Sequence, residues 1–344
     1  MTEWSGFLVH NLSMSQAFTV HDIARLAGVS AMTVSRALNH PERVSPALLA
    51  QVLEVVRRTG FVPNGMAGGL RSSRARLVAA VLPTLVGPVF QETIQSLNQT
   101  LDAHGYQLMI GQSGYNESRE DALLDAIIRR RPDGIVLTGI MHSAAGRRQL
   151  LASGIPVVET WDLTPTPIDM LVGFSNEEIG ASACAYLQQR GYRRPALICG
   201  GDERAQRRAA GFQRMARTLG WEAELPVYLA PAPATLASGR AGLSDLLARA
   251  SGIDAVFCSS DMLALGVLIE AQARGLAVPQ QLAIVGLGDL EFAASLQPAL
   301  TTVRIDGTRI GQTAAHYIID RAEGHAIAQP IVDIGFTIVE RATA

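Results

Sequence analysis

Apolar residues along this chain follow two different spacings. Between residues 18 and 60 they recur every three or four positions, which is the spacing of amphipathic helices. From Leu77 onward, short continuous apolar runs alternate with longer helical patterns, as in parallel β-sheets that helices cover on both faces. The pattern therefore predicts a small all-helical head followed by an α/β region.

Two short helices joined by a sharp turn are predicted at the start of the head, over residues 19–39. Thr19, which stands three residues before Asp22, and Ser30 are suitable N-caps, each contributing about 1 kcal/mol. Gly28 can adopt the positive φ that a sharp turn requires. The inward faces consist of Ile23, Ala24, Ala27, Val34, Ala37 and Leu38. Because such short helices are unstable alone, these faces are expected to pack against each other and against a third helix.

The third helix is predicted to follow a loop at residues 39–43. Ser45 is its expected cap, Pro46 takes the first helical position and Gly60 ends it. Its apolar stripe consists of Leu48, Leu49, Val52, Val55 and Val56. Three helices in this arrangement predict a helix-turn-helix.

The outer face of the second predicted helix carries small, polar and basic side chains. These are Ala31, Met32, Thr33, Ser35 and Arg36. Such side chains suit the major groove of DNA, because arginine can donate two hydrogen bonds to guanine and an apolar group can contact the thymine methyl. The net charge of the whole chain is −2, yet residues 18–76 hold eight arginines against three acidic residues, which gives +5. DNA binding is therefore predicted to be local to this segment.

The α/β region predicts two parallel sheets in succession. Strands are expected at residues 77–82, 106–110, 134–137, 155–158, 195–199, 255–258 and 282–285. Helices are expected near residues 90–103, 118–130, 144–152, 204–219, 236–250 and 262–274. The prediction is a two-lobed domain over residues 77–344, with lobe 1 formed by 77–174 and 304–328, and lobe 2 by 175–303 and 329–344. A ligand is expected in the cleft, beyond the carboxyl ends of the strands.

Length and composition narrow the class of protein. A chain of 344 residues with 48% hydrophobic residues can bury sizeable cores in more than one domain. Its three widely spaced cysteines are expected to be buried thiols in a reducing compartment. No apolar run approaches 18 residues, so no membrane span is expected. Residues 1–17 lack the pattern of a signal peptide and are interpreted as a flexible leader, with Met14 as an alternative start.

Motifs of enzymes and cofactor sites are missing from the sequence. It contains no G-x-G-x-x-G after a strand, no phosphate-binding loop and no G-x-S-x-G, and its seven histidines are scattered. We therefore expect no catalytic residues, no cofactor and no metal.

Three long segments carry a resemblance to a known family. They are D-I-A-R-L-A-G-V-S-A-M-T-V-S-R-A-L-N (22–39), V-S-P-A-L-L-A-Q-V (44–52) and G-F-V-P-N-G-M-A-G-G-L (60–70), followed by shorter matches such as A-V-F-C-S-S-D-M-L-A-L-G (255–266). Over residues 18–341 the chain resembles the lactose/galactose-repressor family of bacterial transcription factors. The resemblance implies a helix-turn-helix domain at 18–63, a hinge helix at 64–76, and a two-lobed domain like the periplasmic binding proteins, which binds an effector and dimerises.

The resemblance also implies roles for residues that contact DNA. The positions that contact base edges are Ala31, Met32 and Arg36, and those that contact phosphates are Thr33, Ser35 and Asn39. Ala67 and Leu70 match the hinge helix, where Leu70 would be a wedge in the minor groove. Gly65, Gly68 and Gly69 depart from the polar residues of the family hinge and weaken the helix here.

Five residues are candidates for effector binding. Arg204 matches the arginine with which the family clamps its ligand, although a surface arginine at a helix start is the alternative. Trp161 offers a flat face for a sugar skeleton or serves packing alone, and Asp162 stands beside it. Asp261 either contacts ligand hydroxyls or caps its helix, while Asp289 is shifted by one position from the family aspartate.

The segments V-V-E-T-W-D (157–162) and V-G-F-S-N-E (172–177), with G-L-G-D (286–289), look most like the gluconate-responsive branch. This implies a repressor of carbohydrate-catabolism genes, cytoplasmic and associated with the nucleoid, that binds operator DNA as a homodimer. Its expected effector is a sugar acid such as gluconate or a ketogluconate, with phosphorylated and uncharged sugars left open. The C-terminal sequence lacks a leucine-heptad tail, so no tetramer is expected. The alternative is a periplasmic-type sugar-binding protein or a sugar-processing enzyme with the same two-lobed fold, against which the arginine-rich head argues.

Overall fold

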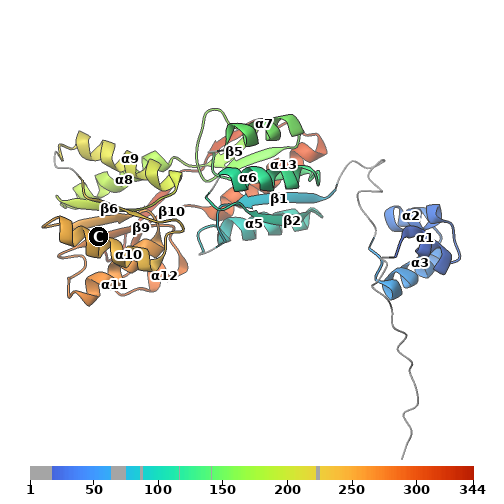
Figure 1. The fold of residues 1–344 in the computed structure, drawn as a ribbon, viewed down its shortest axis with the longest axis horizontal. Coiled ribbons are helices and arrows are strands. Elements are labelled where there is room, and N and C mark those ends of the chain that lie inside the picture. The colour runs from blue at the N-terminus through green and yellow to red at the C-terminus, as the bar shows by residue number, and fades with distance from the viewer. Residues whose placement is uncertain (1–17, 63–74, 86–87, 116, 141, 222–224) are drawn as a thin grey trace, which may run out of the picture. The chain divides into compact units, whose positions relative to one another are not determined.

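The computed structural model describes residues 18–62, 75–85, 88–115, 117–140, 142–221 and 225–344 (Figure 1). The chain divides between Ala75 and Arg76 into two compact units, each with its own core. The first unit is all-helical and the second is α/β. The expected fold class is thus confirmed.

The helical unit consists of α1 (Val20–Leu26), α2 (Ala31–Asn39), the short 3-10 helix η1 (Pro41–Arg43) and α3 (Pro46–Thr59). Thr19 Oγ1 accepts a hydrogen bond from the backbone N–H of Asp22 (3.3 Å), and Ser30 Oγ accepts one from that of Thr33 (3.1 Å), so both predicted caps are confirmed. Gly28 has a φ of +63°, as the sharp turn requires.

The start of α3 differs from the prediction in one detail. Ser45 precedes the helix, but its side chain makes no capping hydrogen bond, so the predicted capping role is wrong. Pro46 occupies the first helical position, where its fixed φ already suits a helix and its missing N–H costs nothing. Gly60 ends the helix in the left-handed conformation, as predicted.

The core of the helical unit joins all three helices. Ile23 of α1, Val34 of α2 and Val52 of α3 are completely buried against one another. Gln51 Nε2 adds a hydrogen bond from α3 to the carbonyl oxygen of Ala27 after α1 (2.9 Å). The orientation of α2 is therefore fixed by packing that its own apolar spacing demands.

Lobe 1 of the α/β unit is a six-stranded parallel sheet in the order β11-β5-β4-β3-β1-β2. Its strands are β1 (Leu77–Leu82), β2 (Gln107–Gln112), β3 (Gly134–Thr138), β4 (Val157–Thr160), β5 (Met170–Gly173) and β11 (Ile331–Asp333). Its helices are α5 (Gln91–Ala103), α6 (Glu117–Ile128), α7 (Ala144–Ser153) and α13 (Gly307–Glu323). Alternate strand residues face opposite sides, so α5 and α13 share one apolar core with the sheet, and α6 and α7 share another.

Lobe 2 repeats this plan with the strand order β12-β10-β9-β8-β6-β7, in which β12 is antiparallel to β10. Its strands are β6 (Pro195–Gly200), β7 (Val227–Ala230), β8 (Ala255–Cys258), β9 (Ala283–Leu287), β10 (Thr301–Arg304) and β12 (Thr337–Val339). Its helices are α8 (Asn176–Gln189), α9 (Glu203–Thr218), α10 (Leu236–Arg249), α11 (Asp261–Ala273) and α12 (Glu291–Ser295). Figure 1 shows α8 and α9 on one face of this sheet and α10 and α11 on the other.

The chain passes between the lobes after β5, after β10 and after β11. The last passage differs from the prediction, because residues 331–333 pair with β5 and belong to the first sheet. Assigning the whole of 329–344 to lobe 2 was therefore wrong, and only the part from β12 onward belongs there. The short run Ile331–Asp333 completes an open edge of lobe 1, which the sequence pattern alone does not reveal.

The described residues provide no ionised thiol, no metal-binding cluster and no membrane-spanning helix. Cys184, Cys199 and Cys258 are free and buried, and burial raises the pKa of the Cys199 thiol to about 12, so it stays protonated. Within the described ranges, no cluster of histidine, cysteine and acidic side chains has the makings of a metal site. None of the helices in these ranges combines the length and apolar character that crossing a bilayer requires.

Candidate DNA-binding face and effector cavity

The outer face of α2 presents the residues predicted to contact DNA. Met32 is 70% exposed, and Ser35, Arg36 and Asn39 are exposed as well, whereas Ala31 and Thr33 are half-buried. Met32, Ser35, Arg36 and Asn39 lie on the side of the helix away from Val34 and Ala37, whereas Ala31 packs against the core that these two residues join. The structure therefore presents four of the six predicted residues on one accessible helix face.

Arg36 has no ion-pair partner among the described residues of the helical unit, unlike Arg25 and Arg57 of the same unit. Arg25 pairs with Asp22 (2.9 Å) and Arg57 pairs with Glu54, but no acidic side chain of residues 18–62 lies within ion-pair distance of Arg36. An unpaired guanidinium keeps all its donors for a ligand. On α2 it is thus the group best prepared for a base or phosphate.

Two polar residues of this face are held by local hydrogen bonds. Thr33 Oγ1 lies 2.9 Å from Ser30 Oγ, and Asn39 Nδ2 donates to the carbonyl oxygen of Ser35 (2.9 Å). These bonds orient the side chains without burying them. The predicted hinge residues Ala67 and Leu70 lie outside the described residues.

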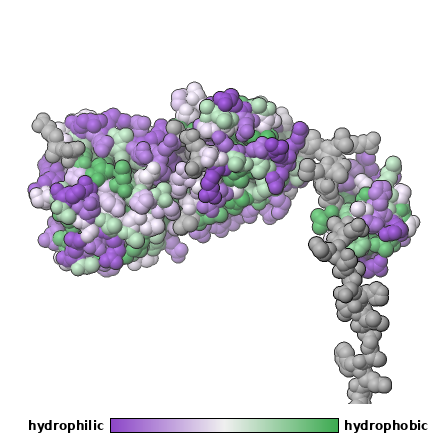
Figure 2. Space-filling model, viewed as in Figure 1, coloured by the Kyte–Doolittle hydropathy of each residue, from purple (hydrophilic) through white to green (hydrophobic). Residues whose placement is uncertain are grey.

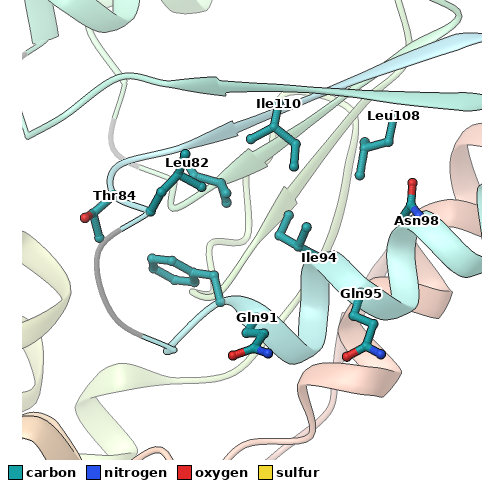
Figure 3. Close-up of a pocket in the computed structure, with 10 residues that line it drawn as sticks. Leu82, Thr84, Gln91, Ile94, Gln95, Asn98, Leu108 and Ile110 are labelled. Atoms are coloured by element: carbon teal, nitrogen blue, oxygen red, sulfur yellow. The ribbon is translucent and has the colours of Figure 1, made fainter.

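Two hollows in the α/β unit share the wall formed by Thr84 and Phe90. The larger, of about 680 Å³, is an open groove in lobe 1 between α5 and the edge strand β2 (Figure 3). Ile94 of α5 and Ile110 of β2 point into it, and Gln91 and Gln95 stand along its helical side. Its lining offers apolar surface and neutral amides, without a charged group.

The smaller hollow, of about 220 Å³, lies between the lobes at the carboxyl ends of the strands, where the fold predicts a ligand. It is lined by Thr84, Val89, Phe90, Tyr115, Trp161, Phe174, Asp202, Arg204, Arg208, Pro233, Ala234, Thr235, Ser259, Ser260, Met262 and Leu287. These residues come from both lobes. The structure thus brings two of the five predicted effector residues, Arg204 and Trp161, to one cavity.

Two arginines from the first turns of α9 give the cavity its positive charge. The Arg204 guanidinium lies 5.2 Å from the centre of the Phe90 ring across the cleft, and its Nη1 is buried without a hydrogen-bond partner. Arg208 is buried, donates to Asn176 Oδ1 and to the carbonyl oxygen of Ser259 (3.3 Å), and keeps its Nε without a partner. Burial lowers the pKa of Arg208, as expected for a cation removed from water. Unsatisfied buried donors are costly, so these two sites favour an anionic ligand that satisfies them.

Aromatic rings form the opposite wall of the cavity. Trp161 packs edge-on against Phe90 (ring centroids 5.0 Å apart) and against Phe174 (5.7 Å). Its Nε1 is a third buried donor without a partner. Trp161 has a φ of +69°, a left-handed conformation that is uncommon for a bulky residue. The wall therefore combines a flat apolar surface with one hydrogen-bond donor, which suits a carbohydrate skeleton.

The three predicted aspartates do not line this cavity. Asp162 is fully buried and accepts a hydrogen bond from Arg207 Nη1 of lobe 2 (3.0 Å), which makes it a bridge between the lobes. Asp261 accepts hydrogen bonds from Thr302 Oγ1 (2.5 Å) and from the backbone N–H of Leu290 (2.9 Å).

Asp261 and Asp289 are also held by partners away from the cavity. Burial raises the pKa of Asp261 to about 6, although its two hydrogen bonds oppose that shift. The cap of α11 is Ser260, so Asp261 does not have the alternative capping role either. Asp289, with a φ of +50°, pairs with Arg341 (2.6 Å). All three stabilise the walls behind the cavity.

Arg208 is the main residue that the sequence analysis missed. It stands four positions after Arg204, so both side chains lie on one face of α9, and this spacing was the signal available in the sequence. Phe90, Phe174 and Ser259 had no comparable signal, because each follows or precedes a different element. Only the fold brings them to the same cavity.

A helix-turn-helix unit with an exposed second helix, followed by a two-lobed unit with a polar interlobe cavity, defines a ligand-responsive transcription regulator. Family comparisons agree with this class. Residues 19–64 match the family described as bacterial regulatory proteins, lacI family, and residues 184–344 match a periplasmic binding protein-like domain. The transcriptional regulator GntR of Pseudomonas aeruginosa is 34% identical over 324 residues, which cover 94% of each chain.

Further relatives and solved structures extend the match. The regulator GntR of Escherichia coli is 30% identical over 93% of this chain and 96% of its own. A LacI-family transcriptional regulator from Silicibacter pomeroyi is 32% identical, with a TM-score of 0.88 over 95% of this chain and 99% of that chain. The lac repressor dimer bound to operator shares the fold, with a TM-score of 0.79 at 20% identity over 95% of this chain and 99% of that chain. The chain belongs to the lacI family and is a DNA-binding transcriptional regulator.

Proposed function

We propose that this regulator is a repressor of carbohydrate-catabolism genes, that it acts as a homodimer on a pseudo-palindromic operator, and that a sugar acid such as gluconate controls it from the interlobe cavity. It would work in the cytoplasm, where it reaches the nucleoid. The observation that carries the choice of ligand is the group of three buried donors without partners on the cavity wall.

A sugar acid satisfies these donors better than a neutral sugar does. Its carboxylate can accept charge-assisted hydrogen bonds from Arg204 Nη1 and Arg208 Nε, which are roughly twice as strong as neutral ones. A hydroxyl oxygen can accept from Trp161 Nε1, while the ring covers the carbon skeleton. Hydroxyls of Thr235, Ser259 and Ser260 on the lobe 2 side offer further polar contacts. We propose Arg204, Arg208 and Trp161 as the residues that bind the effector.

The open groove of lobe 1 supports the homodimer. Leu85 and Ile110 are 58% and 42% exposed at the edge formed by β1, β2 and α5, where an unpaired strand edge and apolar side chains coincide. The neutral amides of Gln91 and Gln95 at this groove allow close approach of a second copy without burying a charge. Figure 2 shows hydrophobic surface intermixed with hydrophilic surface on both lobes, so no uninterrupted apolar face competes on the side shown.

The helical unit supplies the operator contacts in this proposal. Ala31, Met32 and Arg36 contact base edges, Thr33, Ser35 and Asn39 contact phosphates, and Ala67 and Leu70 of the hinge enter the minor groove. Effector that closes the cleft shifts the equilibrium between two lobe arrangements, and the hinge transmits the shift to DNA. A 100-fold change in operator affinity needs about 2.7 kcal/mol of coupling.

Calorimetry of the full chain against gluconate, ketogluconates, gluconate 6-phosphate and neutral hexoses tests the effector. We expect binding heat with at least one unphosphorylated sugar acid and none with neutral hexoses. Heat with neutral hexoses alone would overturn the sugar-acid proposal. Gel-shift titration with DNA from upstream of its own gene, at fixed salt, tests the operator side, and the complex is expected to respond to the same sugar acid.

A further inference from the structure

Lobe 1 contains a buried charged cluster outside the effector cavity. The side chain of His142, in the loop after β3, is 3% exposed. Its Nδ1 lies 2.5 Å from Glu120 Oε1 of α6, and its Nε2 lies 3.5 Å from Glu159 Oε1 of β4. The Glu159 side chain is completely buried. A carboxylate in such a place needs a nearby cation, because burying an unpaired charge is very costly.

His142 supplies that cation at neutral pH. Burial acts to lower its pKa, but the hydrogen bond to Glu120 and the negative charges of Glu120 and Glu159 outweigh burial and raise the pKa to about 9. Other charged groups close by have partners of their own: Asp121 accepts from Ser143 Oγ (2.6 Å), and Arg147 donates to backbone carbonyl oxygens of Thr166 and Pro167. The two glutamates are therefore the charged groups that face the imidazole.

Glu159 also closes the loop that carries Trp161. Its Oε2 accepts a hydrogen bond from the backbone N–H of Ile168 (2.6 Å), which joins the two ends of the connection between β4 and β5. Arg147 of α7 holds the same connection through the carbonyl oxygen of Thr166 (2.9 Å). One carboxylate thus links the histidine to the base of this loop.

Trp161 requires such support because its backbone is strained. A left-handed conformation is unfavourable for a residue with a bulky side chain, and Trp161 has a φ of +69°. Val158 of β4 faces the α5 side of the sheet and Glu159 faces the α6 side, and the left-handed turn brings Trp161 to the α5 side, where the cavity lies. A conformation of this kind persists only where the surrounding structure holds it.

We propose that His142 is a positioning residue for effector binding: held between Glu120 and Glu159, it fixes the loop that presents Trp161 to the interlobe cavity. The effector part rests on the proposed function, since the sugar acid is taken to bind in that cavity. His142 does not line the cavity and acts through Glu159. Its effect must therefore depend on the charge of that carboxylate.

The charge dependence gives the proposal a distinctive test. In His142→Gln the cation is lost, and the buried Glu159 carboxylate is left without the charge that lies beside it in the parent. The loop that Glu159 holds is then expected to be displaced. The double variant His142→Gln/Glu159→Gln has no buried charge at these two positions and keeps an oxygen acceptor for the N–H of Ile168, so it is expected to restore the loop.

The fluorescence of Trp161 reports whether its indole ring is buried. In a background with Trp4→Phe and Trp221→Phe, Trp161 is the one remaining tryptophan of the three in the sequence. Without effector, the emission of His142→Gln is expected to move to longer wavelength at about pH 8, because a displaced indole meets water. In calorimetry at about pH 8, its affinity for gluconate is expected to fall about tenfold, and the double variant is expected to bind like the parent.

Asp121→Asn is the matched control, because Asp121 neighbours Glu120 on α6 but accepts a hydrogen bond from Ser143 rather than facing His142. It is expected to leave the emission unchanged. Parent-like emission of His142→Gln at about pH 8, or a folded double variant with displaced emission, would overturn the proposal. Should His142→Gln fail to fold, the double variant alone decides. Displaced emission without gluconate binding by any form, the parent included, supports the positioning role and counts against the proposed effector.

Discussion

The DNA-binding face and the effector cavity are built in opposite ways. The six positions proposed to contact DNA lie within the nine residues of α2, and the period of one helix decides which of them are exposed. The cavity takes Phe90 from before α5, Trp161 from after β4, two arginines from α9 and Ser259 from after β8. A site on one helix tolerates small changes elsewhere, whereas a site assembled from both lobes depends on every contact that holds them. The following predictions test this difference.

The largest effect is expected from Arg208→Met. The change removes a buried cation from the cavity and leaves Asn176 and the carbonyl oxygen of Ser259 without their donor. Losing one partner of a buried charged hydrogen bond costs about 2–4 kcal/mol, so gluconate affinity should fall by about 30- to 1000-fold. Calorimetry measures it, with the exposed Arg214→Met as control. Retained affinity in a folded Arg208→Met would show that the cavity does not bind the acid through this residue.

The second effect concerns stability of the α/β unit at alkaline pH. Because the pKa of His142 is raised from 6.5 to about 9, its stabilisation is complete below pH 6.5 and is lost as pH rises through about 9. The loss amounts to at most about 3 kcal/mol. Thermal unfolding of the full chain at a series of pH values should show it in the parent and not in His142→Gln/Glu159→Gln. The helical unit, which has no such buried pair among its described residues, should unfold without this alkaline loss.

Arg36→Ala should weaken operator binding by about 1–3 kcal/mol, which is about 5- to 150-fold, because it removes an unpaired guanidinium from the face proposed to contact DNA. Gluconate affinity should stay unchanged, since the site lies in the other unit. Arg25→Ala is the control: this arginine is exposed on α1 and already pairs with Asp22. Gel-shift titration at fixed salt measures both, and equal losses for the two variants would contradict a special role of Arg36.

Substitutions at the helix caps of the helical unit should have the smallest effect. Thr19→Ala removes an observed capping hydrogen bond and should lower the free energy of unfolding of the helical unit by about 1 kcal/mol. Ser45→Ala removes a side chain that makes no capping bond, so it should change that free energy much less. Thermal unfolding followed by circular dichroism distinguishes them. A larger loss for Ser45→Ala would mean that α3 begins differently in solution.

The head was largely predictable because its determinants are local. Thr19, Ser30, Gly28 and Gly60 act on neighbours within four residues, and the structure confirms each of them. The capping role predicted for Ser45 was wrong, because a residue type suited to capping does not ensure that its side chain bonds to the helix. The alternating apolar runs likewise predicted two parallel sheets. Short strands such as β7 and β11 escaped, because three or four residues carry too little pattern to distinguish them from loops.

The set of residues that line the interlobe cavity could be known only from the tertiary structure. One of its two arginines, Arg204, was predicted from the sequence. The other, Arg208, could have been predicted from its position four residues later on the same helix. Asp162, Asp261 and Asp289 show the opposite problem: their type suits a sugar site, but Arg207, Thr302 and Arg341 engage them behind the wall. The role of Glu159 was hidden completely, since a glutamate in an apolar strand gives no sign of its partner in a loop 17 residues away.

By itself, then, the sequence determined the helix-turn-helix, the exposed face of α2 and the two-sheet plan, because helical period, strand runs, caps and glycines act over a few residues. Only the tertiary structure decided which side chains share the interlobe cavity, which acids are already paired, and how His142 comes to lie between two glutamates. Those outcomes depend on contacts between segments far apart in the chain, and burial then sets their electrostatics.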